Sequence, residues 1–509
     1  MKRWIFVLAL CLALPAGAEE KKKKEKEKEA KPAVAERAAA SADDFMKQAE
    51  EKERAGSLDE AIDLLRRAVA IAGASGEPSL RLGRALETKY DLDGAIDAYR
   101  SAAEKVAGPA KGEALARMAV AQALRGMAEA AASAQAATEA DPDGVWPQIA
   151  LSRLRAREGK ADEAITLARK AVAAGGGAPA SAALGLAEEA KGDLSAAEAT
   201  YREVLAAAPG SIPATVGLAR VLRKTGRAAD AEPMLQKAIE AAPGAIDAYK
   251  ESARVKVAQG RPGEAVGDAA IAAAMAENDP EAQRLVVQVK VAQALDWVGR
   301  NQADLAVQDL TALRDQNPDD ADVRLGLGKA LIAKRQADAA QAELAKAVEI
   351  EPGLAEAHFQ LGYVFHVLKK DPAGALAPYE KAVAADPANV EYRTNLGAVL
   401  SDLKQVDRAV AELTRVTETP GYGKADAWIY IGAAYLGAKK YKEAVPPLRK
   451  AAELAPDNAQ VQAYLGWTYF GLKDAENFKK HAGRAKALGH KEPTLLNYLS
   501  RIEAGEPIK

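Results

Sequence analysis

The chain has 509 residues, a formal net charge of −2 and a single cysteine. Near-neutral charge gives no support to nucleic-acid binding, which depends on an excess of Lys and Arg, and one cysteine excludes an internal disulfide framework. Hydrophobic residues make up 49% of the chain but aromatic residues only 5%, so we expect a core of small apolar side chains, which suits closely packed helices.

The first predicted element is a secretory signal peptide at residues 1–18. It has a basic start, an apolar run at 4–14 and a small-residue ending, and we expect cleavage after Ala18. The run of 11 residues is shorter than the ~20 that a membrane-spanning helix needs, so no transmembrane segment is predicted in the mature chain. Cys11 does not indicate a lipid anchor, because Leu10 stands where a small residue is required.

A charged linker is predicted at residues 19–41. Residues 19–31 contain five Glu, seven Lys and one Ala, and an Ala-rich stretch follows Pro32. Such a segment cannot bury a core. We interpret it as a solvated spacer, with contact to anionic envelope polymers as the alternative.

From residue 42 onward the sequence is periodic. A small residue is followed four residues later by a larger apolar one and three after that by another small or apolar one, which is a helical spacing. The first members are Ala61, Ala95, Ala130, Ala164, Ala197, Ala231, Ala265, Ala306, Ala340, Ala375, Ala409, Ala444 and Phe478. Successive steps are 33 to 35 residues, with one step of 41. A fixed period of this length predicts one helical module repeated in tandem.

The clearest unit has Trp428, Ile431, Gly432 and Tyr435 on a first helix, Ala444, Leu448 and Ala451 on a second, and Pro456 at the end. With these residues the unit resembles the tetratricopeptide repeat. The resemblance covers roughly residues 42 to 490. It implies an all-α fold, a right-handed α-solenoid of about thirteen antiparallel helix pairs, that binds proteins or peptides on its concave face.

The predicted organisation has four parts after the linker. N-terminal repeat units occupy 42–274, a lengthened helical segment 275–302, C-terminal units 303–490, and a capping helix and tail 491–509. Thr494 is the expected cap of a last helix from Leu495 to Ala504. The 41-residue step between Ala265 and Ala306 is either a tolerated insertion or a change of superhelix pitch that separates two lobes.

Glycines on the first helices predict close helix contacts. Gly362, Gly397 and Gly432 stand where the second helix of the same unit has to approach, and we expect the Ala that begins each second helix to face that gap. The four histidines are scattered, and carboxylates do not form a recognisable pair. We therefore predict no catalytic residues, no metal site and no cofactor.

A binding groove is predicted where aromatic residues gather. Of the 23 aromatic residues after residue 18, 16 lie at 355–509. By the repeat resemblance, certain first-helix positions face the concave side. The candidate groove residues are Phe359, Tyr363, His366, Asn395, Tyr430, Tyr464, Trp467 and Phe470. The alternative is that these aromatic residues fill the core.

Some family members grip the terminal carboxylate of a peptide with basic and amide side chains. Asn395 matches one position of that clamp, whereas Phe359 and Tyr363 occupy positions where Lys and Asn would be needed. We therefore expect a ligand held by apolar and main-chain contacts.

These features predict a non-catalytic scaffold of the bacterial cell envelope. The signal favours the periplasm, with an extracellular or outer-membrane-associated place as alternatives, and association with a membrane complex is compatible with either. The partners expected are proteins or peptides, within a machine for pilus assembly, surface or gliding motility, secretion or outer-membrane biogenesis. The alternative functions are an enzyme or accessory subunit acting on cell-wall polymer, and a purely structural spacer.

Overall fold

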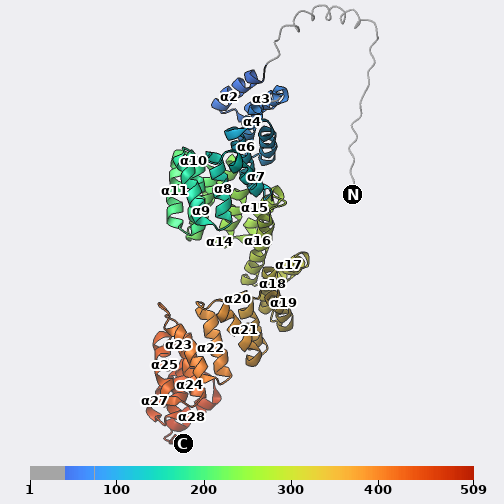
Figure 1. Cartoon of the computed structure of the whole chain (residues 1–509). Helices are drawn as coiled ribbons and strands as arrows, with labels where there is room; N and C mark the ends of the chain where they lie inside the picture. The colour runs from blue at the N-terminus through green and yellow to red at the C-terminus, as the bar shows by residue number, and fades with distance from the viewer. Residues whose placement is uncertain (1–40, 74, 509) are drawn as a thin grey trace, which may run out of the picture. The chain divides into compact units, whose positions relative to one another are not determined.

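Helices account for every regular element in the described part of the chain. The computed structural model describes residues 41–73 and 75–508, so the predicted signal peptide and all but the last residue of the predicted linker lie outside it. This part contains 27 α-helices and one π-helical turn, and the prediction of an all-α solenoid is confirmed (Figure 1). None of these helices is long and apolar enough to cross a membrane.

The described residues divide into two compact units. Unit 1 comprises residues 41–225 and 233–248, and unit 2 comprises residues 226–232 and 249–508. The first helices in chain order are α2 (Ala42–Arg54), α3 (Leu58–Ile71), α4 (Glu77–Thr88), α5 (Leu92–Lys105), α6 (Gly108–Leu124), α7 (Ala130–Ala140), α8 (Val145–Arg157), α9 (Ala161–Ala173), α10 (Gly177–Lys191), α11 (Leu194–Ala207), α12 (Ile212–Lys224), α13 (Ala228–Ala241) and α14 (Ile246–Ala258). The remaining elements are α15 (Pro262–Met275), α16 (Pro280–Gly299), α17 (Ala303–Gln316), α18 (Ala321–Ala333), α19 (Ala337–Ile350), α20 (Ala355–Tyr363), η1 (Val364–Leu368), α21 (Pro372–Ala385), α22 (Val390–Asp402), α23 (Val406–Thr417), α24 (Asp426–Gly437), α25 (Tyr441–Leu454), α26 (Ala459–Gly471), α27 (Ala475–Ala487) and α28 (Pro493–Glu503).

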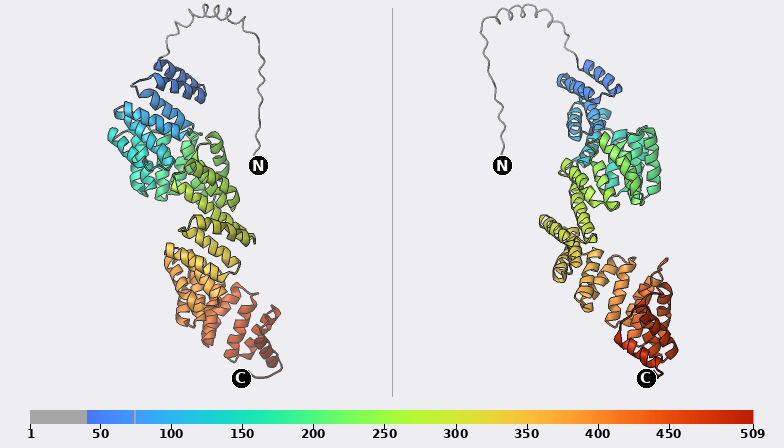
Figure 2. Two further views of the ribbon diagram at one scale, coloured as in Figure 1. Left: turned by 90° about the vertical axis from the view of Figure 1, so that its right-hand side faces the viewer. Right: turned by 180° about the vertical axis from the view of Figure 1, so that it is seen from behind.

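Thirteen helix pairs, α2/α3 to α26/α27, follow one another along the chain, and α28 closes the series. The small residue that defines the period lies in the second helix of each pair and is buried, as in Ala61, Ala265 and Ala444, all with no exposed surface. Figure 2 shows the pairs stacked side by side within each unit. The period in the sequence therefore corresponds to one helix pair, as predicted.

A left-handed residue makes the sharp turn inside most pairs. Glycine takes this position after α2, where Gly56 has a φ of 77°, and other pairs force a larger residue into the same conformation, such as Lys439 with a φ of 58°. After the turn, Asp often caps the second helix; Asp193, for example, accepts a hydrogen bond from the backbone N–H of Ala196. The turn and the cap thus set where each second helix begins.

Glycines on the first helices are crossed by large side chains. A Cβ added at Gly362 would lie 2.6 Å from the ring of Tyr379, and one at Gly432 would lie 2.4 Å from Leu448 Cγ. The expectation that glycine permits close packing is correct, but the crossing residue is not the Ala that begins the second helix. It is the residue four positions later, because that side chain projects across the interface.

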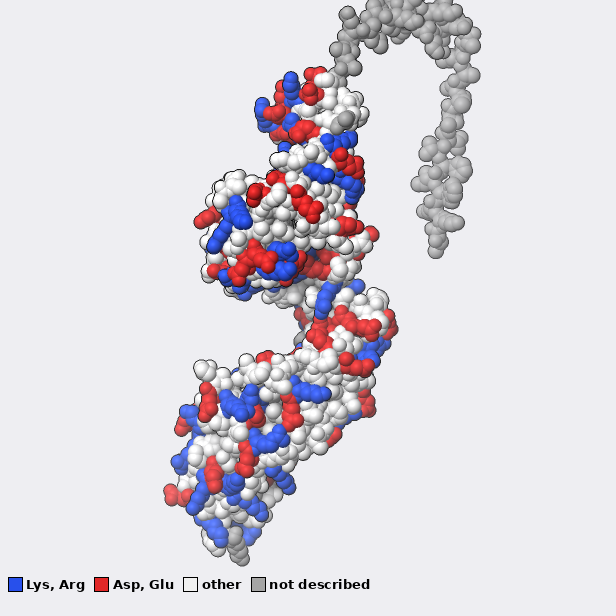
Figure 3. Space-filling model, in the orientation of Figure 1, with Lys and Arg blue, Asp and Glu red and all other residues white. Residues whose placement is uncertain are grey.

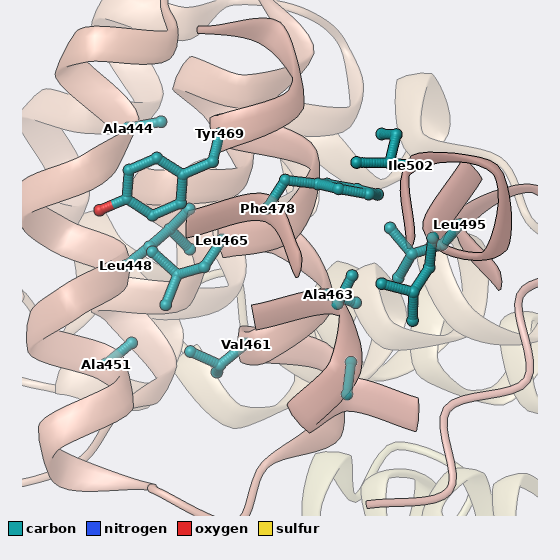
Figure 4. Packing of buried hydrophobic residues seen from close by; sticks show 13 residues of the cluster. Ala444, Leu448, Ala451, Val461, Ala463, Leu465, Tyr469, Phe478, Leu495 and Ile502 are labelled. Carbon is teal, nitrogen blue, oxygen red and sulfur yellow. The ribbon is translucent and has the colours of Figure 1, made fainter. Parts of the chain in front are cut away.

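The last pair is closed by α28. Phe478 stands where other units have Ala, has no exposed surface, and points toward Leu495 and Ile502 of α28 (Figure 4). The last helix begins earlier than expected, at Pro493, and its N-cap is Glu492, which makes no side-chain cap hydrogen bond; Thr494 is not the cap. The large Phe fits because α28 covers it in place of another repeat.

The 41-residue step places its additional residues in α16, which at 20 residues is the longest described helix. The division between units 1 and 2 does not fall in this segment. It falls earlier, at residues 226–249 within α13 and α14.

Two tyrosines at the same repeat position give a first testable prediction. The Tyr99 hydroxyl donates to Glu87, whereas the Tyr379 hydroxyl is buried and makes no hydrogen bond to a described residue. We expect Tyr99→Phe to lower the free energy of unfolding by about 1.5–3 kcal/mol, and Tyr379→Phe to leave it unchanged or raise it by about 1 kcal/mol. Urea denaturation of the two variants measures the difference, and equal losses would contradict the assigned hydrogen bonding.

Candidate functional site

The first helices of the pairs form the inner surface of the repeat stack. Successive first helices contact each other, as α22 contacts α24 and α24 contacts α26 in unit 2, and α6, α8 and α10 do in unit 1. Second helices make their main contacts with their own partner and with the next first helix. Elements that touch across neighbouring repeats lie on the shorter, inner side of the curve, so first-helix side chains line the concave face of each unit.

The predicted groove residues fall into different environments. Tyr430 is 38% exposed, and Tyr363, His366, Asn395 and Tyr464 are partly buried. Asn395 directs its side-chain amide to the carbonyl of Glu391 on its own helix, at 2.9 Å. Seven of the eight predicted residues are therefore at least partly open to solvent, because Trp467 and Phe470 are also only partly buried.

Phe359 has a different role, because its ring is buried. It stacks on Tyr392 with ring centroids 4.8 Å apart and lies 5.7 Å from the ring of Tyr379. Only 7% of Phe359 is exposed. Phe359 therefore supports the inner surface from behind and offers little area to a ligand.

Trp467 and Phe470 also depart from the expectation. The Trp467 indole N–H donates to Glu492 at 3.0 Å, and both rings pack against Tyr498 of α28, with centroids 6.0 Å and 4.6 Å away. At these positions α28 packs against the rings. Both residues are partly exposed, but most of their contacts are with the C-terminal core.

Three tyrosines and two carboxylates come together on the inner side of unit 2, and we call Tyr363, Tyr430, Tyr464, Asp402 and Asp426 the tyrosine surface. Burial raises the pKa of the Tyr430 hydroxyl, and the neighbouring Asp426, Tyr464 and Asp402 raise it further. The pKa of Tyr379, behind this surface, is raised by burial and by the nearby Tyr363 and Tyr430. With its pKa raised, the Tyr430 phenol stays protonated at neutral pH, and it offers a hydrogen-bond donor and a ring face.

The two carboxylates of this surface were not among the predicted residues. Asp402 ends α22 and Asp426 begins α24, and neither forms an ion pair with a Lys or Arg in the described chain. Asp402 accepts a hydrogen bond at 2.8 Å from Nε2 of His366, which joins α22 to the preceding pair. The sequence alone did not single out these two carboxylates, because acidic residues are scattered over the whole chain.

A π-helical turn at Val364–Leu368 sets the position of His366. The N–H of Lys369 donates to the carbonyl of Val364, five residues earlier, at 3.0 Å. The His366 ring meets the Tyr379 ring edge to face at 6.1 Å, and its Nδ1 is buried without a hydrogen bond to a described residue. Such turns often occur at functional sites, since they redirect a side chain without ending the helix.

A hydrogen-bonded carboxylate fixes the rear of this surface. Glu356 accepts from Lys329 at 3.1 Å, from Gln360 at 2.8 Å and from the Tyr392 hydroxyl at 2.8 Å, so three first helices are joined. Burial raises the pKa of Glu356, but the hydrogen bonds from Gln360, Tyr392 and Lys329 outweigh it and the net pKa is lowered. An ionised carboxylate here disfavours the terminal carboxylate of a peptide.

The remaining chemistry is that of a binding surface. No three His, Cys, Asp or Glu side chains within residues 41–508, apart from the undescribed residue 74, gather in a way that could hold a metal ion. Over the visible faces of both units, Lys and Arg are mixed with Asp and Glu (Figure 3). The tyrosine surface, which offers ring faces, phenol donors and two carboxylates, suits a ligand with apolar groups and a positive charge.

Comparison with known proteins matches part of the chain to models described as tetratricopeptide repeat, at residues 149–212 and 394–459 for one model and 189–250 and 298–361 for another. Type IV pilus assembly protein PilF of Pseudomonas aeruginosa is 30% identical over 136 residues, which cover 26% of this chain and 53% of that protein. Tetratricopeptide repeat protein 37 of Xenopus laevis is 28% identical over 137 residues, covering 27% of this chain and 9% of that protein.

The chain thus spans about half the length of the first relative and a small part of the second. Among solved structures, the APC/C hetero-tetramer Cut9–Hcn1 aligns with 91% of this chain and 96% of its own, at a TM-score of 0.44 and 15% identity. Residues 149–250, 298–361 and 394–459 therefore match tetratricopeptide repeat models, and the thirteen helix pairs at a period near 34 residues have the arrangement of such repeats.

Proposed function

We propose that this chain is a non-catalytic scaffold that binds a partner protein on the tyrosine surface of unit 2. The observation that carries this proposal is the gathering of three partly open tyrosines and two carboxylates without Lys or Arg partners on the inner first helices of the described chain. Aromatic side chains of this kind supply most binding energy at protein interfaces. The expected ligand is a segment of a partner that carries Lys or Arg beside apolar side chains.

We further propose that this scaffold lies in the bacterial cell envelope, in the periplasm, and that it serves an assembly machine. The signal-like residues 1–18 support export, and the match to a protein named for type IV pilus assembly favours pilus assembly over motility, secretion or outer-membrane biogenesis.

The test uses two fluorescein-labelled peptides of about ten residues, one alternating Lys with Leu and Phe, the other with Glu in place of Lys. Fluorescence anisotropy with the full chain should show binding of the basic peptide only. Tyr430→Ser and Asp426→Asn should each weaken it by about three- to tenfold, because each removes a ring face or a charge. The matched control is Asp407→Asn on the second helix α23, where the carboxylate is 94% exposed and pairs with Lys440.

Each result is decisive. Equal binding of the two peptides, or equal effects of Asp426→Asn and Asp407→Asn, would contradict a specific surface and favour the structural-spacer alternative. Circular dichroism confirms that each variant retains its helices.

A further inference from the structure

Unit 1 contains a pocket of about 520 Å³ on the inner side of its first helices. Its apolar lining includes Val120, Leu124, Trp146, Ile149, Ile212 and Pro213, from α6, α8 and α12. This volume lies in the range of sites that hold small organic molecules. The pocket is separate from the tyrosine surface, since every lining residue belongs to unit 1.

One side of this pocket is walled by a contact between distant turns. The turn residue Tyr90, between α4 and α5, meets Gly244, between α13 and α14, so closely that a Cβ on Gly244 would lie 2.4 Å from the Tyr90 carbonyl oxygen. Tyr90, Ala241 and Ala242 all line the pocket. This contact bounds the pocket on one side, and its volume suits a small molecule.

Two of the three arginines that line the pocket are already paired. Arg84 donates two hydrogen bonds to Glu113, at 2.9 Å and 2.6 Å, and Arg117 donates to Glu113 at 2.7 Å and to Glu87 at 2.8 Å. The Arg117 guanidinium also stacks 3.4 Å above the Trp146 ring. These contacts hold the aromatic wall of the pocket in place.

The third arginine, Arg153 of α8, differs. It lines the pocket, yet no carboxylate oxygen of the described residues lies within 4.0 Å of its guanidinium, and it makes no hydrogen bond to them. Burial lowers the pKa of Arg153 and the neighbouring Arg157 lowers it further, while Asp247 opposes them. Asp247 lies 3.9 Å from Arg157 instead. A partly buried guanidinium in a pocket, without a carboxylate partner among the described residues, favours an anionic ligand.

We propose that the unit 1 pocket binds a small free organic carboxylate, with its carboxylate on Arg153 and an aromatic or branched aliphatic body against Trp146 and Ile149. The guanidinium supplies two parallel donors to the carboxylate, and the apolar wall buries the body. A carboxylate at the end of a peptide shares this chemistry, and the experiment separates the two sources.

The probes are phenylacetate, indole-3-acetate and 4-methylpentanoate, each compared with its primary amide, and titration calorimetry with the full chain measures binding. At least one acid should bind at least about tenfold more tightly than its amide, because only the acid pairs with the guanidinium. Arg153→Met should weaken that acid about ten- to a hundredfold. The matched control is Arg169→Met, which removes an exposed arginine from α9 and should change nothing.

A melting-temperature measurement and one further variant separate loss of binding from loss of folding. Arg153→Met should not lower the melting temperature, because the guanidinium has no ion-pair partner to lose. Ala178→Trp places a large ring in the pocket from a partly buried wall position and should block binding with Arg153 intact.

Four results would overturn the proposal: no acid binding below about 5 mM, equal binding of acid and amide, equal effects of Arg153→Met and Arg169→Met, or tighter binding of the peptide Gly-Gly-Phe than of every free acid. None of these outcomes depends on the tyrosine surface.

Discussion

Replacing Gly432 with valine is expected to lower the free energy of unfolding by about 3 kcal/mol. A Cβ at this position would lie 2.4 Å from Cγ and 2.5 Å from Cδ2 of Leu448, which has no exposed surface. The first and second helices of the pair would have to separate, and the neighbouring pairs would lose their contacts with them. Thermal and urea denaturation followed by circular dichroism measure the loss.

A double-mutant cycle tests whether the contact between position 432 and Leu448 causes this loss of stability. Leu448→Ala alone should cost about 2–5 kcal/mol by leaving a cavity, and combined with Gly432→Val it should cost less than the sum, because the valine fills that cavity. Gly437→Ala is the control on the same helix, since nothing lies within 4 Å of its added Cβ, and it should not destabilise. Strictly additive losses in the double variant would show that the Gly432 and Leu448 contact is not the source.

Replacing Lys250 with methionine should cost about 3–5 kcal/mol at neutral pH. The Lys250 side chain is 5% exposed, and its ammonium donates to Asp279 at 3.1 Å and to Glu281 at 2.9 Å. In the variant, the nearly buried Asp279 keeps its negative charge but loses the ammonium of Lys250 that compensates this charge. Lys450→Met is the control, because Lys450 is 48% exposed and pairs only with Glu453, and it should change stability by less than about 1 kcal/mol.

This loss should depend on pH. Burial raises the pKa of Glu281, but Lys250 and Arg254 outweigh burial, so the net pKa is lowered in the folded state. A lowered carboxyl pKa contributes stability above the unfolded pKa, near 4.3, that is lost as pH falls through the folded pKa. The difference between Lys250→Met and the parent chain should therefore shrink below about pH 4; a difference that stays constant from pH 7 to pH 3 would contradict the ion pairs.

The repeat architecture was predictable because it depends on local pattern. Ala61, Ala265 and Ala444 recur at helix-pair intervals, and only a small residue fits there, so the sequence contains the period directly. Other features depend on which side chain reaches across an interface. The sequence placed Gly432 correctly but not the crossing Leu448, since helical projection decides which residue meets the glycine.

The site was harder to predict, for reasons that are visible in single residues. Trp467 occupies a first-helix position of the kind predicted to face the groove, but it packs against α28. The position of a residue in the repeat does not show which other helix contacts it. The turn at Val364–Leu368 depends on a five-residue hydrogen bond that no propensity indicates.

The unit 1 pocket was missed although part of its signal was present. Arg84, Arg117 and Arg153 recur at nearly the repeat period, at steps of 33 and 36 residues. What the sequence does not contain is the contact of Tyr90 with Gly244, which bounds the pocket on one side. Nor does it show that Arg84 and Arg117 pair with carboxylates while Arg153, the third arginine of the pocket lining, has no carboxylate partner among the described residues.

The most direct measurement of the central claim is photo-crosslinking in the native cell with a benzophenone amino acid. One chain carries it at position 430 on the tyrosine surface, and a second at position 381, where the exposed Lys381 lies on the second helix α21. We expect one discrete partner to be captured from position 430, through a segment that contains Lys or Arg beside apolar residues. This capture should be lost when Asp426→Asn is added, and it should be absent from position 381. The same partner captured equally from both positions, or none from position 430, would contradict binding at the tyrosine surface.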